Sequence, residues 1–298
     1  MNKKELIKTV IVMLLWGSLF PFIKLGYSAF EIDTAYFPNL LLFAGARFLI
    51  CGAAITAFCA VRVKSISVKS KIQWLRIISV GMFAVVLHYS FTYIGLTLAD
   101  SSKTALLKQL GVLIFICFSF LFFKEDKFSI VKPAGAGLGL MGILVLNTDS
   151  LKFSFGLGEG LIIAASFCTV ISNISCKKLT AELNPVAATG YTQLLGGIIL
   201  TVIGLGCGGR IGTVTPYACA IFVYISAASI IGYCMWYSVV QKNNLSGLFI
   251  VKFLEPLFAS LFGALLLGEK IFTIQHISAF LFVLGAILCV SVSGRIKQ

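Results

Sequence analysis

Residues 39–61 read NLLLFAGARFLICGAAITAFCAV, and Arg47 is the one charged residue among them. An α-helix needs about 20 predominantly apolar residues to cross the hydrocarbon core of a bilayer. This stretch is therefore predicted to span a membrane as a helix. Nine further stretches meet the same criterion, with ends uncertain by a few residues, and they are 8–27, 74–97, 102–123, 130–147, 156–176, 186–207, 217–240, 245–267 and 274–294.

The composition excludes a soluble domain. Apolar residues make up 59% of the 298 residues and charged residues 12%, whereas a soluble domain carries about 25% charged residues. The formal net charge of +13 would suggest nucleic-acid binding in a soluble protein. Here the basic residues lie between apolar runs, so we expect no nucleic-acid partner. The nine cysteines contain no C-x-x-C pair, which indicates neither a metal site nor a disulfide framework.

The basic residues predict the orientation in the membrane. With the N-terminus in the cytoplasm, sixteen Lys and Arg fall in cytoplasmic segments and four in outer segments. Cytoplasmic loops carry an excess of Lys and Arg. We therefore expect both termini in the cytoplasm and a location in the cell (plasma or inner) membrane.

The chain resembles itself at an offset of 144 residues. Polar and aromatic identities at this offset include Tyr89 with Tyr233, Tyr93 with Tyr237, Lys108 with Lys252, and Glu125 with Glu269. Each half holds five predicted helices, and because five is odd the second half enters the membrane with reversed polarity. Inverted repeats of this kind are common in secondary transporters.

The sequence thus predicts an all-α integral membrane protein with ten transmembrane helices as two inverted five-helix repeats. The first repeat is expected at residues 1–147 and the second at residues 156–294. We expect Glu125 and Glu269 to cap or brace the next helix on their side.

Several motifs resemble the drug/metabolite transporter (DMT) superfamily, EamA family. They are Trp16-Gly17-Ser18 followed by Lys24, Ala46-Arg47-Phe48, and Leu254-Glu255-Pro256-Leu257 followed by Leu267-Gly268-Glu269-Lys270. The first half departs from the pattern, with Gly111-Val112 at the place of the proline and Lys124-Glu125 in place of Gly-Glu. The resemblance implies two EamA units and transport of small metabolites, and it leaves the substrate open.

Charged residues inside a membrane span are costly, so each is a candidate for function. Lys108 and Lys252 are expected roughly 10 Å deep from opposite sides, where they would flank a central cavity and bind an anionic group of the substrate. The structural alternatives are a local ion pair of Lys252 with Glu255, three residues on, and snorkelling or pairing across helices for Lys108. Arg47 either lines the cavity or pairs structurally, and Lys24 is expected to snorkel.

Two titratable residues are candidates for coupling transport to a proton or cation. Glu255 precedes Pro256, which removes a backbone hydrogen bond and frees carbonyls beside the carboxylate. Its structural alternative is a charge partner for Lys252 or Arg47. His88 lies well inside a span and titrates near neutral pH, and its alternative is a packed histidine.

Aromatic residues recur at matched positions in spans 74–97 and 217–240. Tyr89, Tyr233, Trp236 and Tyr237 either pack or form a cavity wall that contacts the substrate. The glycines of Gly137-Leu-Gly139-Leu-Met-Gly142 lie in an apolar helix, so we expect close helix packing, with a homodimer as a further option, rather than a nucleotide site.

The leading hypothesis is a secondary transporter that works by alternating access. Four basic residues against one acid within the spans favour an anionic or carboxylate-bearing substrate. An exporter of amino acids or amphipathic drugs is the alternative. A membrane-embedded enzyme would need paired catalytic groups that the spans lack, so we expect no enzyme, no cofactor and no metal; the expected partners are a small-molecule substrate and membrane lipid.

Overall fold

The computed structural model is all-helical where it describes the chain, over residues 2–62, 67–98, 101–123, 129–146, 156–268 and 274–293. Glu125 and Glu269 lie outside these ranges, so their predicted bracing role stays a prediction. The helices are α1 (Lys3–Ala29), α2 (Phe37–Arg62), α3 (Lys71–Gly81), a π-helical segment η1 (Met82–Leu87), α4 (His88–Leu98), α5 (Ser101–Phe118), η2 (Ser119–Leu121), α6 (Val131–Leu146), α7 (Leu157–Thr180), α8 (Pro185–Gly206), α9 (Pro216–Lys242), α10 (Leu245–Val251), α11 (Leu254–Leu267) and α12 (Ile274–Ser293).

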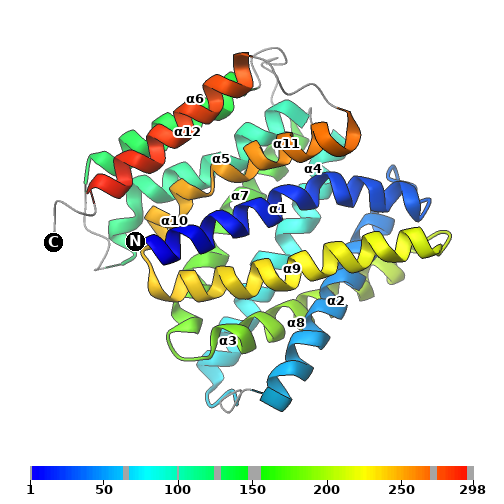
Figure 1. Ribbon diagram of the computed structural model, residues 1–298. Helices are drawn as coiled ribbons and strands as arrows, with labels where there is room; N and C mark the ends of the chain where they lie inside the picture. Colours follow the sequence, from blue (N-terminus) through cyan, green and yellow to red (C-terminus); the bar gives the residue numbers. More distant parts are fainter. Residues whose placement is uncertain are drawn as a thin grey trace.

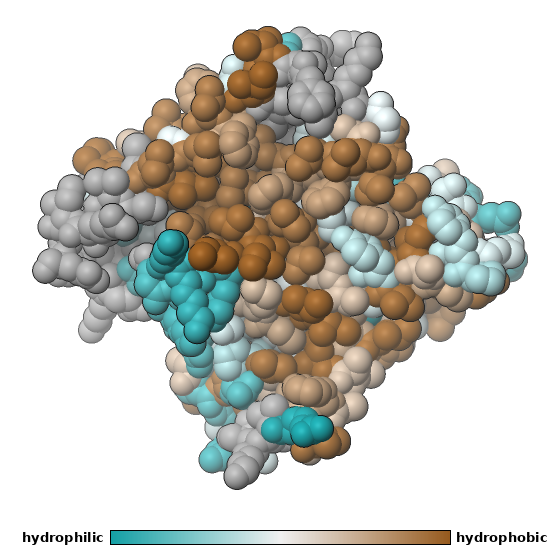
Figure 2. Space-filling model, in the orientation of Figure 1, coloured by the Kyte–Doolittle hydropathy of each residue, from teal (hydrophilic) through white to brown (hydrophobic). Residues whose placement is uncertain are grey.

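Helical structure occupies each of the ten predicted stretches. Within the described residues, seven helical stretches are long and apolar enough to cross a membrane, and three shorter apolar helices lie at 107–121, 131–145 and 277–288. Figure 2 shows hydrophobic residues over the middle of the visible face, while hydrophilic residues gather near the two ends of α1. Exposed apolar side chains of this extent need lipid around them. The chain is therefore a multi-pass α-helical membrane protein.

Local sequence explains where two long helices begin. Asn184 and Thr215 are the residues before α8 and α9, and their side-chain oxygens accept the N–H of Val186 at 2.9 Å and of Ala218 at 3.1 Å. Pro185 and Pro216 occupy the first position of each helix. An N–H at this position has no partner within the helix, so the missing N–H of proline costs nothing there. Capping side chain and proline together start each helix at this position.

Two predicted spans differ from single regular helices. The stretch 74–97 contains the π-helical segment η1 in its middle, and nothing in the sequence signals it. The stretch 245–267 divides into α10 and α11 at Lys252 and Phe253. Because Pro256 has no N–H, the carbonyl of Lys252 instead accepts the N–H of Glu255 at 3.0 Å.

The helices form two flanking pairs with a central group between them (Figure 1). One pair is α2 with α8 and the other is α6 with α12, and they lie at opposite ends of the view. Between them, α1 packs on α9 and α11, while α7 packs on α3–α4 and on α5. The central group thus consists of α1, α3–α4, α5, α7, α9 and α10–α11.

Glycines let α2 and α8 meet backbone to backbone. Gly45 and Gly52 lie seven residues apart on α2, and Gly197 and Gly204 lie seven apart on α8. A methyl group on Gly52 would lie 2.2 Å from the backbone nitrogen of Leu194, and one on Gly197 equally close to that of Leu49. A side chain at either position would force the two helices apart.

The glycines of α6 also serve packing within the chain. A methyl group on Gly139 would lie 2.5 Å from the ring of Phe253, and one on Gly142 would lie 2.9 Å from the carbonyl of Ala279 in α12. The expected close packing is confirmed for these two glycines, and the homodimer stays a prediction.

We predict that Gly197→Ala lowers the melting temperature of the detergent-purified protein. Overpacking costs about 1–3 kcal/mol, which exceeds the roughly 1 kcal/mol that alanine gains over glycine in a helix. Gly206→Ala on the same helix is the matched control, because no atom lies within 4 Å of its added methyl group. Equal melting temperatures for the two variants would contradict the close contact.

Candidate functional site

A cavity of about 830 Å³ lies in the central group of helices. Its volume falls within the range of roughly 300–1,000 Å³ typical of small-molecule sites. Its wall comes from α1, α2, the α3–η1–α4 stretch, α5, α7, α9 and the α10–α11 stretch. All nine residues predicted to bind substrate or couple transport line it, namely Arg47, His88, Tyr89, Lys108, Tyr233, Trp236, Tyr237, Lys252 and Glu255.

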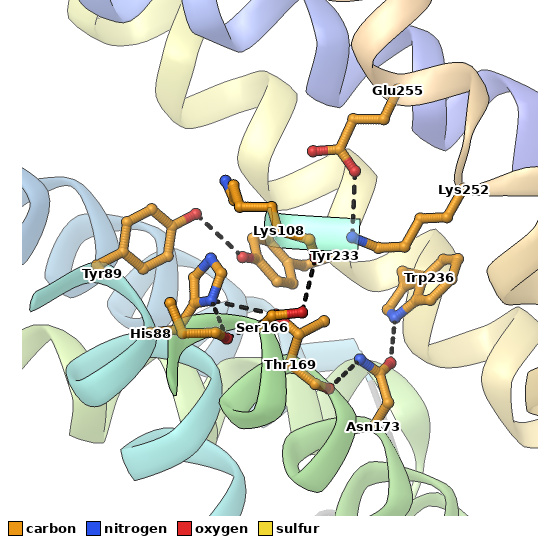
Figure 3. A network of polar contacts seen from close by, with 11 residues as sticks. His88, Tyr89, Lys108, Ser166, Thr169, Asn173, Tyr233, Trp236, Lys252 and Glu255 are labelled. Carbon is orange, nitrogen blue, oxygen red and sulfur yellow. Dashed lines mark hydrogen bonds and ion pairs between the residues drawn. The ribbon is translucent and has the colours of Figure 1, made fainter. Parts of the chain in front are cut away.

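Aromatic rings form one continuous side of the cavity. The ring of Trp16 lies 5.1 Å from that of Tyr233 and 5.3 Å from that of Trp236, between ring centroids. The hydroxyl groups of Tyr89 and Tyr233 are 3.3 Å apart (Figure 3). These two tyrosines are the pair that the offset of 144 residues relates, so matched positions of the two halves meet at this wall.

Lys252 and Glu255 form an ion pair across the break between α10 and α11. Their charged groups are 3.1 Å apart, and each side chain is less than a fifth exposed. The local ion pair considered for Lys252 is therefore present, and the ammonium also lies 5.3 Å from the centre of the Trp16 ring. Because both side chains line the cavity, the pair belongs to the candidate site as well.

Lys108 faces the same cavity without an ion pair among the described residues. Its ammonium lies 5.3 Å from the centre of the Phe20 ring. The backbone around it is held by Ser166 on α7, whose hydroxyl donates to the Lys108 carbonyl at 2.7 Å and accepts the N–H of Gly111 at 2.8 Å. A methyl group on Gly111 would collide with Ser166, so α5 and α7 approach closely here and fix the position of the lysine.

Arg47 is the most buried cation of the site. Its side chain is 1% exposed, and none of its three nitrogens has a hydrogen-bond partner among the described residues. The guanidinium lies 4.5 Å from the ring centre of Phe48 and 5.5 Å from that of Tyr89. The structural ion pair considered for Arg47 is therefore not formed with any residue that the structure describes.

The energetics of Arg47 favour a role other than stability. Ring contacts of this kind contribute about 0.5–2 kcal/mol, whereas desolvating a charged side chain costs several kcal/mol even after relaxation. The unpaired guanidinium is thus a net cost to the fold as it stands. Such residues inside a membrane are functional candidates by default.

His88 belongs to a polar chain along α7. Its Nδ1 lies 3.1 Å from the carbonyl oxygen of Ala165 and 3.1 Å from the Thr169 hydroxyl. Asn173 donates from its amide to the Thr169 carbonyl at 2.7 Å and accepts the indole N–H of Trp236 at 2.8 Å (Figure 3). The histidine is therefore held in one orientation while its ring faces the cavity.

Further residues line the cavity that the sequence did not single out. Asn173 is a polar residue inside a span, so the rule that found Lys108 also applied to it. Tyr27 and Thr92 gave no signal, because such residues are common in helices with no special role. Lys24 also lines the cavity and its side chain is exposed, while its predicted snorkelling stays a prediction.

The count of one acid within the spans was wrong. Glu159 lies inside the predicted stretch 156–176 and is buried. Its carboxylate accepts the N–H of Gly156 at 3.0 Å and caps α7, and it does not line the cavity. Glu255 is the one acid among the cavity-lining residues that the structure describes.

We predict that Glu255→Gln lowers the melting temperature, because the ammonium of Lys252 loses its partner at a cost of about 1–3 kcal/mol. The double variant Lys252→Met, Glu255→Gln should recover most of the loss, since it leaves no unpaired charge. Thermal unfolding of the purified variants in detergent measures both. Equal losses from the single and double changes would show that the pair does not contribute in this way.

The chain is similar in sequence to known membrane transporters. A model of the EamA-like transporter family matches residues 3–148 and 156–291. An uncharacterized transporter of Archaeoglobus fulgidus is 24% identical over 276 residues, which cover 91% of each chain. A probable amino-acid metabolite efflux pump of Escherichia coli is 23% identical over 297 residues, covering 96% of this chain and 94% of that protein.

A solved crystal structure with 19% sequence identity has the same fold, with a TM-score of 0.79 over 100% of both chains. The family match spans most of the chain, and the motifs quoted from the sequence lie within it. The predicted resemblance is confirmed: the chain belongs to the EamA-like transporter family and is a multi-pass membrane transporter rather than an enzyme.

Proposed function

We propose that the protein is a secondary transporter that carries a small anionic metabolite through the central cavity by alternating access. The observation that carries this proposal is the cavity itself, lined by Arg47, Lys108 and the Lys252–Glu255 pair. With the guanidinium and both ammonium groups charged, these four side chains sum to a net charge of +2. A substrate with a carboxylate or phosphate would offset this charge in surroundings of low polarity.

Alternating access rests on two inverted repeats of five transmembrane helices, residues 1–147 and 156–294. The helix contacts support this arrangement. In the proposed repeat α7 corresponds to α1, the α3–α4 stretch to α9, and α5 to α11. The contacts of α1 with α9 and α11 therefore correspond to the contacts of α7 with α3–α4 and α5. The α2–α8 and α6–α12 pairs each map onto themselves. In Figure 1, α5 and the α10–α11 stretch run in opposite directions, as inversion requires.

Contacts between loops support the proposed topology, with both termini in the cytoplasm of a cell membrane. Arg76 pairs with Glu182 at 2.6 Å, and both belong to predicted cytoplasmic segments. The Thr213 hydroxyl donates to the carboxylate of Glu31, and both residues belong to predicted outer segments. The loops assigned to one side thus contact each other.

Proton or cation coupling through Glu255 or His88 belongs to the same proposal. Protonation of Glu255 would free Lys252 for a substrate anion, which links the two binding events. His88 contacts α7 from α4, so a change in its charge would act on the contact between these helices.

Export of amino acids or amphipathic drugs is the second candidate. It draws on the Escherichia coli relative, which is a probable amino-acid metabolite efflux pump. An amine on the substrate would suit Glu255 and the aromatic wall. The first candidate requires an anionic group on the substrate, whereas the second also predicts transport of compounds without one.

We predict that Lys108→Ala lowers uptake of an anionic substrate into proteoliposomes about tenfold or more, since about 1.4 kcal/mol of lost attraction gives a factor of ten. A panel of labelled metabolites identifies the substrate with wild-type protein first. Lys178→Ala, an exposed lysine at the end of α7, is the control and should leave uptake unchanged. Unaltered uptake by Lys108→Ala at equal protein level would refute the anionic substrate; preferred uptake of uncharged or cationic compounds would favour the second candidate.

A further inference from the structure

The part of the cavity wall around Arg47 has an excess of hydrogen-bond donors. Buried polar atoms without a hydrogen-bond partner among the described residues include all three nitrogens of Arg47 and the hydroxyl of Thr92, while the Tyr27 hydroxyl faces that of Tyr93. Arg47, Thr92 and the two tyrosines line the cavity. A guanidinium donates only, whereas a hydroxyl can donate or accept. The guanidinium therefore leaves this wall with more donors than acceptors among the described residues.

The described part of the protein supplies no carboxylate to fill that place. Glu255 pairs with Lys252, Glu159 caps α7, and Glu5 pairs with Lys8 at 3.1 Å near the start of α1. Buried donors are normally satisfied, and an unsatisfied set needs an explanation. A ligand that brings acceptor oxygens into the cavity provides one.

The charge of this wall selects the kind of acceptor. Arg47 contributes one positive charge, and rings of Phe48 and Tyr89 lie against it. A carboxylate neutralises one charge and matches the planar fork of a guanidinium with two parallel hydrogen bonds. A phosphate with two negative charges would leave one of them unpaired among aromatic rings, which is costly.

Resting on the proposed transport function, we propose that Arg47, with the hydroxyls of Tyr27 and Thr92, forms a subsite for a carboxylate group of the substrate. The apolar part of the substrate then lies along the ring series Tyr89, Tyr233 and Trp16, whose members follow one another from Arg47 toward Lys252. Lys108 and Lys252 attract the anion at longer range, whereas Arg47 fixes the orientation of its carboxylate.

Benzoate and benzamide test this subsite because they share one shape and differ in charge. In a thermal-shift assay on the purified protein, benzoate at ten times its dissociation constant should raise the melting temperature by about 3 °C. Benzamide should give no shift, and inorganic phosphate should give none. A shift with phosphate and none with benzoate would overturn the choice of a carboxylate.

Arg47→Gln should abolish the benzoate shift, and Arg47→Lys should weaken binding at least tenfold because the lysine lacks the planar fork. Arg62→Gln is the matched control: it removes the same charge from the exposed end of the same helix, and it should keep the shift. A persistent shift in Arg47→Gln, or no benzoate shift in the wild-type protein, would overturn the proposal.

The melting temperature without ligand separates binding from folding. Since the guanidinium has no hydrogen-bond or ion-pair partner in the part of the chain that the structure describes, Arg47→Gln should melt at or above the wild-type temperature. A marked fall, with Arg62→Gln unchanged, would assign Arg47 to structure and contradict the subsite.

Transport assays separate this inference from the proposed function. If proteoliposomes carry a carboxylate equally well with Arg47→Gln, the subsite is wrong and the transporter assignment stands. If benzoate binding depends on Arg47 and proteoliposomes carry no compound of the panel, the subsite stands and the proposed transport activity fails.

Discussion

The close contact of α2 with α8 is the constraint on which the arrangement depends. Glycines at seven-residue spacing let the two backbones approach until no side chain fits between them. Without water in the bilayer core, helices associate through such packing rather than through the hydrophobic effect. The α2–α8 pair forms one flank of the molecule and α6–α12 the other (Figure 1). The cavity is lined by the central helices together with α2. Arg47 is positioned by α2 itself.

Several residues that line the cavity cost the fold stability. Three features lower the stability of the folded state. They are the buried guanidinium of Arg47 and the ammonium of Lys108, neither of which has an ion pair among the described residues, and the interruption of a helix at Lys252. Binding sites commonly retain such costs because the ligand offsets them. The interruption between α10 and α11 places Lys252 on irregular backbone and Glu255 in the first turn of α11. Irregular backbone is tolerated at membrane depth only where it lines a cavity or is buried in protein.

Much of this architecture follows from the sequence because lipid imposes strict demands. Apolar runs predicted the ten helical stretches. The rule that charged residues in spans are candidates for function selected Arg47, Lys108, Lys252 and Glu255, and all four line the cavity. Pairing across helices could not be predicted, so the sequence left open whether Arg47 had a partner. Tyr27 and Thr92 were missed because only their position beside the cavity distinguishes them. The seven-residue spacing of Gly45 and Gly52 was visible, yet its meaning depends on the facing helix.

Access to the cavity from both sides of the membrane tests the central claim most directly. Ala84 lines the cavity near the middle of the α3–η1–α4 stretch, and Ala84→Cys in a cysteine-free background places a reactive thiol there. A membrane-impermeant maleimide should label it in right-side-out vesicles and also in inside-out vesicles. Phe58→Cys, on the lipid-facing surface of α2, should stay unlabelled and so detects any reagent that enters the bilayer. Labelling from both sides agrees with alternating access; labelling from one side alone would contradict it.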